Sequence, residues 1–236
     1  MDRVIGHRGC AGLAPENTEA GIRLAAKLGV SAVEVDVTMT DEGYLPIFHD
    51  SSLARCTNGR GDIGSANWDY LSSLDNGSWF DRRFTDSRIL QLHELLALIT
   101  ELDLTLNLEL KVHKKEAREL AMAAGSVVSQ WANGQDQFTI SSFSHEALEQ
   151  YHLVYPEHRL GYLFEKLPDN WQGLVSSVSA STLHLCASTA SEAEINTIKD
   201  AGYPVYLYTV NQRKQFDRWL QMGVDGIFTD YPDRML

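Results

Sequence analysis

The sequence predicts an α/β protein in which eight parallel strands alternate with helices and close into a barrel. The chain has 236 residues, close to the ~250 residues typical of a (β/α)8 barrel. Strand-like and helical segments alternate along its whole length, which favours a parallel sheet. A unit of helix, glycine and apolar strand recurs at Gly29, Gly202 and Gly223. We therefore expect a single domain over residues 1–236.

The first strands precede a long irregular segment. A short apolar strand covers 3–6, a helix opens at 15–18 and ends at Gly29, and a second strand begins at 31. Residues 38–45 are too few for a crossover helix, so the connection to the next apolar segment, 46–48, should lack one. Residues 51–88 have no clear periodicity, and a loop of this length is usually functional. The prediction is a TIM-type barrel with one helix-less connection and an inserted lobe at 51–88, after the third strand. The lobe either covers one mouth of the barrel or merely decorates the surface.

The remainder of the chain alternates more regularly. Helical spacing is present in 92–99 and 117–131, Ser144 is placed to cap a further helix, and 171–178 is a shorter candidate. A capping box at 191–194 starts the next helix, and the last one precedes Gly223. Together with the three segments above, we count nine strand-like segments, one more than the barrel requires. The later strands are expected at 104–110, 138–140, 159–164, 182–185, 205–209 and 226–229.

Composition and charge exclude several classes of function. The chain is 44% hydrophobic and 22% charged, with a net charge of −12. Nucleic acids and anionic membranes need a basic surface, so we expect neither as a partner. Three distant cysteines without a Cys-x-x-Cys motif predict neither a disulfide framework nor a cysteine zinc site. No signal-like or spanning apolar run is present. We therefore expect a cytoplasmic protein without stable membrane association.

Polar residues gather where the predicted strands end. In a β/α barrel the carboxyl ends of all strands meet at one mouth, where the active sites of this fold lie. Residues far apart in sequence should therefore converge in space. The starts of the strands mostly lack such residues. The expected mouth residues are His7, Arg8, Glu34, Asp36, His49, Glu109, Lys111, Ser142, Phe143 and Asn211.

Three of these residues predict a metal site. Glu34 and Asp36 are two apart in a strand, so their side chains share one face. Carboxylates at this spacing repel each other unless a positive charge lies between them. With Glu109, they form an oxygen-rich set that suits one Mg²⁺ or Ca²⁺ ion. The alternative is an exposed edge strand whose acids face water.

Two cations and two histidines complete the chemistry at the mouth. Arg8 and Lys111 are interpreted either as ion-pair partners of the acids or as ligands for an anionic substrate. His7 and His49 can exchange protons near neutral pH. A metal, cations and an acid–base pair together favour cleavage of a phosphate ester.

Two neighbouring motifs are interpreted as structural. Residues 15–18 open a helix, and Glu16 is alternatively a hydrogen-bond partner behind the site. Asp230, at the end of the last strand, is interpreted mainly as a turn and ion-pair residue.

Taken together, these motifs resemble the glycerophosphodiester phosphodiesterase family, specifically its short cytosolic bacterial members. They follow the family's order over nearly the whole chain, and their strength lies in the combination. One departure is Tyr208, where many members have Trp. The motifs are His7-Arg8-Gly9, Pro15-Glu16-Asn17-Thr18, Glu34-Val35-Asp36-Val37, Phe48-His49-Asp50, Leu108-Glu109-Leu110-Lys111, Ser141-Ser142-Phe143, Tyr208-Thr209-Val210-Asn211 and Gly223 to Asp230.

The resemblance implies a metal-dependent hydrolysis of glycerophosphodiesters to sn-glycerol 3-phosphate and an alcohol. It implies catalytic roles for His7 and His49 and phosphate binding by Arg8 and Lys111. The implied metal ligands are Glu34, Asp36 and Glu109. The nucleophile is water or the adjacent glycerol hydroxyl, and the second route passes through a cyclic phosphate.

Two other classes stay open at this point. A related phosphodiesterase of the phospholipase kind would act on a lipid, and a basic or apolar rim on the lobe would favour it. A binding protein that kept the fold would hold metal without turnover. The sequence leaves the oligomeric state undetermined.

Overall fold

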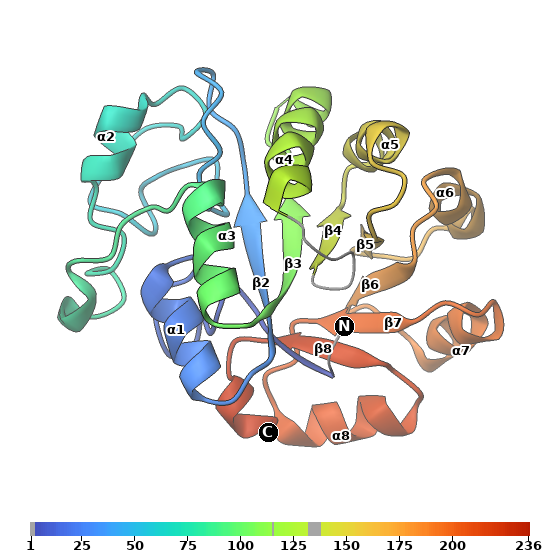
Figure 1. The fold of residues 1–236 in the computed structure, drawn as a ribbon. Helices are drawn as coiled ribbons and strands as arrows, with labels where there is room; N and C mark the ends of the chain where they lie inside the picture. Colours follow the sequence, from blue (N-terminus) through green and yellow to red (C-terminus); the bar gives the residue numbers. More distant parts are fainter. Residues whose placement is uncertain (1–2, 115, 132–137) are drawn as a thin grey trace.

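The computed structural model describes residues 3–114, 116–131 and 138–236. Its eight strands are all parallel and close into a barrel in chain order, which confirms the predicted fold class. Helices surround this barrel on the outside (Figure 1). The strands are β1 (Val4–Gly6), β2 (Ala32–Val37), β3 (Thr105–Leu110), β4 (Phe138–Ser142), β5 (Leu160–Phe164), β6 (Thr182–Cys186), β7 (Val205–Tyr208) and β8 (Gly226–Thr229).

Helices occur between successive barrel strands where the sequence predicts them. Thr18, Ser144 and Ser191 act as N-caps, each accepting a backbone N–H bond. Glu194 completes the predicted capping box at Ser191. The outer helices are α1 (Glu19–Lys27), α3 (Leu92–Glu101), α4 (Ala117–Trp131), α5 (His145–Val154), α6 (Trp171–Ser177), α7 (Glu192–Asp200) and α8 (Arg213–Gln221).

The alternation of side chains along β2 shows how the barrel separates its two cores. Val33, Val35 and Val37 belong to the large apolar cluster that includes residues of the helices. Glu34 and Asp36 are also buried, but they point to the opposite face, into the barrel. A small separate apolar cluster consists of Ile5, Ala32, Tyr206 and Phe228.

The extra strand-like segment is 46–48, which lies outside the barrel. Ile47 forms an isolated antiparallel bridge with Val37, and Pro46 forms one with Gln91. The predicted third strand is therefore not a barrel strand, because the chain turns back along β2 here rather than crossing over. The helix-less connection joins β2 to this segment, and the lobe lies between β2 and β3.

Residues 51–88 contain a short helix α2 (Trp68–Ser73) and a 3-10 helix η1 (Arg82–Phe84). They lie to one side of the barrel, beyond α1 and α3 (Figure 1). A cluster of buried apolar residues separate from the main core holds this region together. Its members are Phe48, Leu53, Cys56, Ile63, Leu71, Leu74 and Ile89.

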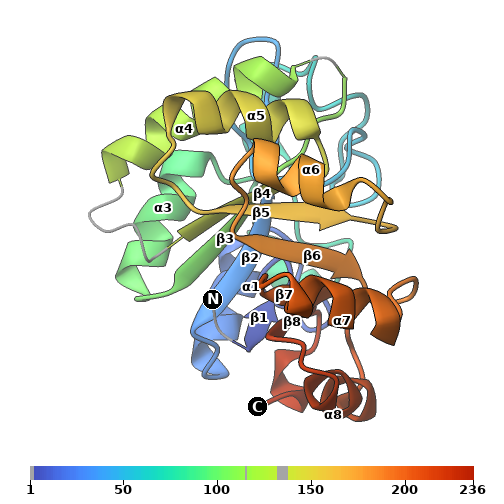
Figure 2. The same ribbon diagram turned by 90° about the vertical axis from the view of Figure 1, so that its right-hand side faces the viewer.

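The arrows of β5 and β6 point toward the side of the molecule on which part of the turquoise trace of this lobe emerges (Figure 2). The lobe therefore borders the mouth formed by the carboxyl ends of the strands. Among the described helices, none is long and apolar enough to cross a membrane.

Candidate active site

The predicted metal carboxylates come together on two neighbouring strands. In the register of β2 with β3, Asp36 pairs with Glu109 and Glu34 pairs with Asn107. One oxygen from each of Glu34, Asp36 and Glu109 lies within 4.8 Å of the others. All three side chains are buried, so the alternative of an exposed acidic edge strand is wrong.

The electrostatics of this cluster fit a divalent cation. Burial, with the neighbouring charges of Asp36 and Glu109, raises the pKa of Glu34 well above its ordinary value. Burial also raises the pKa of Glu109 to about 7, although Lys111 opposes this. Oε1 of Glu34 is buried without a hydrogen-bond partner in the described residues. An oxygen-binding cation would satisfy this atom and offset the repulsion.

The two predicted cations lie against the same carboxylates. Nζ of Lys111 is 2.8 Å from Glu109 and 3.5 Å from Asp36. Nε of Arg8 is 3.4 Å from Asp36. Burial alone would raise the pKa of Asp36, but the charges of Lys111 and Arg8 outweigh it and lower that pKa. Both cations are therefore ion-pair partners of the acids, and both also line the cavity.

A tight turn after β1 directs Arg8 toward this cluster. Arg8 and Gly9 both have positive φ angles, 50° and 88°. Gly6 precedes them, and a Cβ atom there would lie 2.0 Å from the carbonyl oxygen of Gly9. The turn lets the backbone N–H of Arg8 donate a 2.9 Å hydrogen bond to Glu34.

Each predicted catalytic histidine is held by an aspartate. Nδ1 of His7 lies 2.6 Å from Asp230, and Nδ1 of His49 lies 2.6 Å from Asp50. Nε2 of His7 is 3.9 Å from Glu34. Burial lowers the pKa of His49, while the charge of Asp36 opposes this effect.

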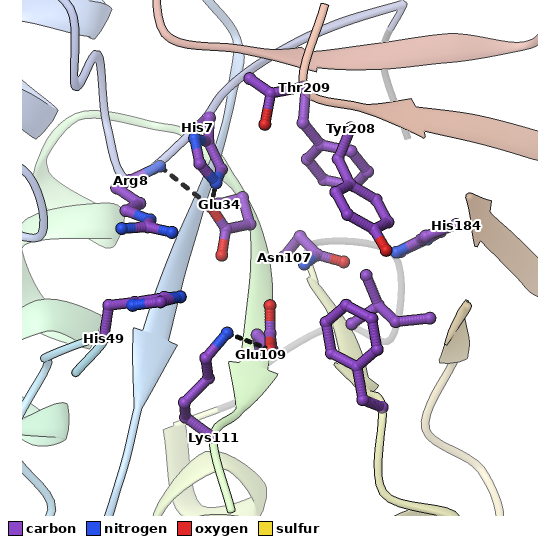
Figure 3. Close-up of a pocket in the computed structure, with 13 residues that line it drawn as sticks. His7, Arg8, Glu34, His49, Asn107, Glu109, Lys111, His184, Tyr208 and Thr209 are labelled. Carbon is purple, nitrogen blue, oxygen red and sulfur yellow. Dashed lines mark hydrogen bonds and ion pairs between the residues drawn. The ribbon is translucent and has the colours of Figure 1, made fainter. Parts of the chain in front are cut away.

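The two histidines, the two cations, Glu34 and Glu109 line one cavity of about 150 Å³, whereas Asp36 is not among its lining residues. His7, Arg8 and His49 point into it from one side, Glu34 and Glu109 lie between the walls, and Tyr208 faces them (Figure 3). Apolar and aromatic side chains also line this cavity. Its lining residues include Phe143, Leu163, Tyr208 and Phe228.

Several supporting residues were missed or differently interpreted from sequence. Asp230 pairs with His7, which agrees with its interpretation as an ion-pair residue, although the sequence did not indicate its partner. Asn211 does not line this cavity; its amide donates a 2.7 Å hydrogen bond to Asp230. Ser142 instead donates to the carbonyl of Leu110. Glu16 is the hydrogen-bond partner behind the site, since it accepts a 2.7 Å bond from Arg8.

Asn17 is a further residue without an assigned role in the sequence. Its amide donates a 2.9 Å hydrogen bond to the carboxylate of Asp36 and accepts one from the backbone of that residue. The signal in the sequence was its place in the 15–18 motif, which brings α1 against the mouth.

A parallel β/α barrel with buried carboxylates, cations and aspartate-held histidines at one mouth is the kind of site found in hydrolases of this fold. Comparison with known proteins agrees. The model of the glycerophosphoryl diester phosphodiesterase family matches residues 7–234. The chain belongs to this family.

Individual relatives extend over almost the whole chain. A glycerophosphodiester phosphodiesterase from Caldanaerobacter subterraneus is 30% identical over 99% of this chain and 96% of its own. A glycerophosphodiester phosphodiesterase from Bacillus altitudinis is 28% identical over 99% of this chain and 96% of its own. A phosphodiesterase from Oleispira antarctica, solved with the product sn-glycerol-3-phosphate, has a TM-score of 0.97 and 34% identity, covering 100% of this chain and 95% of its own. The predicted family and enzyme class are confirmed.

Proposed function

We propose that this enzyme hydrolyses glycerophosphodiesters to sn-glycerol 3-phosphate and an alcohol, with one Mg²⁺ or Ca²⁺ ion. One observation carries the proposal: two cations, two aspartate-held histidines and the carboxylates of Glu34 and Glu109 line the same cavity, and a carboxylate oxygen of Asp36 lies within 4.8 Å of both acids. The similar Oleispira antarctica enzyme binds sn-glycerol-3-phosphate. A cavity of about 150 Å³ is smaller than the ~300–1,000 Å³ of sites for drug-sized ligands, which favours a small substrate.

The cation would be held by Glu34, Asp36 and Glu109. When bound, it supplies positive charge that offsets the charge developing on the phosphoryl oxygens. Arg8 and Lys111 bind the same oxygens, Arg8 as a planar fork and Lys111 as a point charge.

The two histidines move the protons. His7 acts as base and takes the proton of the nucleophile, which is water or the adjacent glycerol hydroxyl. A new bond from this oxygen to phosphorus forms as the bond to the leaving alcohol breaks. Attack by water gives sn-glycerol 3-phosphate directly, whereas attack by the hydroxyl gives a cyclic phosphate that water then opens to the same product. His49 acts as acid and protonates the departing oxygen. The lowered pKa of His49 favours its neutral form, and an anionic phosphodiester beside the ring opposes that effect.

The proposal is tested by incubating the protein with glycerophosphocholine and glycerophosphoethanolamine, with Mg²⁺, Ca²⁺ or a chelator. The measurement is the sn-glycerol 3-phosphate released. We expect metal-dependent release that H7A and H49A each reduce about 10²–10⁴-fold in kcat. If the protein hydrolyses lysophospholipids but neither glycerophosphodiester, the substrate class is a lysophospholipid instead. Metal binding without release from any of these substrates would favour a binding protein instead.

A further inference from the structure

Arg55, in the inserted lobe, lies behind both halves of the site. Its guanidinium donates two hydrogen bonds to Asp50, at 2.6 and 2.9 Å. It donates two more to Glu16, both at 2.7 Å. One side chain thus joins a carboxylate before α1 to a carboxylate after segment 46–48.

Each of these carboxylates in turn holds a residue that faces the cavity. Asp50 is 2.6 Å from Nδ1 of His49. Glu16 accepts a 2.7 Å bond from Nη1 of Arg8. Arg8 and His49 enter the cavity from the same side (Figure 3). The result is a continuous chain of contacts from His49 through Asp50, Arg55 and Glu16 to Arg8.

We propose that Arg55 is a positioning residue, through which the lobe fixes the phosphate-binding Arg8 and the proton-transferring His49 relative to each other. This inference rests on the roles proposed above for Arg8 and His49. Arg55 does not itself line the cavity. Its function is to keep the two carboxylates at a fixed separation with a rigid four-bond fork, which a flexible ammonium group cannot reproduce.

The negative charges of Glu16 and Asp50 explain why a cation is required between them. Without Arg55, Glu16 and Asp50 would lose the cation that lies between them and would be free to separate. Glu16 is buried, whereas the side chain of Arg55 is 45% exposed. Solvent therefore has access to the cation, and a small external cation can enter the space left by a truncated side chain.

Arg23 provides a closely matched control on the outer face of α1. It also bridges two carboxylates, with bonds of 2.7 Å to Glu19 and 2.7 and 2.9 Å to Glu101. Its side chain is 41% exposed, nearly as much as Arg55. No residue of this second network lines the catalytic cavity.

The experiment compares R55A, R55K and R23A by thermal unfolding and by kcat and KM for glycerophosphodiester hydrolysis. We expect R55A to lose about 10–100-fold in kcat/KM, because small displacements of catalytic groups cost this much. R23A should stay within about twofold of wild type. R55K should recover only part of the loss, and added guanidinium should raise the activity of R55A while equal NaCl does not.

E16Q and D50N separate the two arms of the network. E16Q should mainly raise KM, since it releases Arg8, and D50N should mainly lower kcat, since it releases His49. Combined with R55A, each should cost less than the sum of the single losses, because both act through one network.

Equal activity of R55A and R23A would overturn the inference. So would full activity of R55K, or a loss in R55A that neither lysine nor guanidinium relieves, since Arg55 would then act only on folding. H49A in the same assay distinguishes the two proposals: if H49A also keeps wild-type activity, the proposed catalytic function itself fails.

Discussion

Nδ1 of His7 lies 2.6 Å from Oδ1 of Asp230, although 223 residues separate them in sequence. The pairing of β1 with β8 closes the barrel and brings the two residues together. A carboxylate at Nδ1 holds the proton on that nitrogen and leaves Nε2 as an acceptor. This is the tautomer that a general base requires, and Nε2 lies 3.9 Å from Oε2 of Glu34.

The first prediction concerns this pair. D230N keeps the shape of the side chain but allows its amide to donate to Nδ1, which favours the wrong tautomer of His7. We expect kcat to fall about 10²–10⁴-fold, as such changes do in histidine–aspartate pairs. Steady-state kinetics on glycerophosphocholine measure the effect.

Asp225 supplies the control for that substitution. Its side chain is 33% exposed, similar to the 25% of Asp230, and it pairs with Lys199 away from the cavity. D225N should keep its wild-type kcat. If D230N does so too, the carboxylate is not needed to orient His7.

The second prediction separates the base from the acid. A nitrophenyl phosphodiester releases nitrophenolate, which departs without needing a proton. H49A should therefore recover most of its activity on this substrate relative to glycerophosphocholine. H7A should be impaired on both substrates, because the nucleophile still has to lose its proton.

Comparing the ratio of kcat values on the two substrates for each variant decides the assignment. A selective recovery of H7A instead of H49A would exchange the two roles. Such an exchange would agree with the lowered pKa of His49, whose neutral ring is the form of a base.

The parts of the candidate site that depend only on the alternation of side chains along a strand were predictable from the sequence. Glu34 and Asp36 share a face because side chains alternate in a strand. Glu109 lies opposite Asp36 because of the register of β2 with β3. The predicted strand ends indicated that the two residues would be near each other, but not that they would pair. The contacts of Asp230 and Arg55 depend on barrel closure and on the path of the lobe, and no local pattern encodes either.

The fold was predictable for a similar reason. Alternating apolar segments indicate a parallel barrel, but a strand of three residues such as 46–48 carries the same local signal inside or outside the sheet. Only pairing decides its place, and Ile47 pairs antiparallel with Val37. The nine predicted segments therefore included all eight barrel strands, but the sequence did not show which segment lies outside the barrel.

The third prediction concerns the carboxylate cluster. Mg²⁺ or Ca²⁺ should raise the unfolding temperature of the wild type. At a hundredfold excess over Kd, binding should add about 2.7 kcal/mol to the free energy of unfolding. E34Q should lose this response and its binding heat in calorimetry. In chelator, however, E34Q should be more stable than wild type, because one buried acid with a raised pKa is removed.

The exposed acid Glu101 provides the comparison. E101Q should bind metal as wild type does and show no gain in chelator. A metal response that persists unchanged in E34Q would place the cation elsewhere.

The fourth prediction concerns stability at acid pH and rests on His184. This residue is fully buried inside the barrel, against the rings of Tyr206 and Phe228. Nε2 pairs with Oγ1 of Thr182 at 3.0 Å. Burial lowers the pKa of His184 to about 3, so the folded protein keeps the ring neutral.

The sign of the effect follows from proton binding in the two states. Below pH ~6.5, the unfolded chain protonates His184 and the folded chain does not, so the free energy of unfolding falls as the pH falls. The loss approaches 1.4 kcal/mol per pH unit and continues toward the folded pKa. Between pH 7 and pH 5 it amounts to about 2 kcal/mol from this residue. H184Q should remove that contribution, whereas H93Q, which changes an exposed histidine on α3, should not. Urea unfolding of the three proteins at both pH values tests this, and equal pH dependence in all three would show that His184 titrates in the folded state.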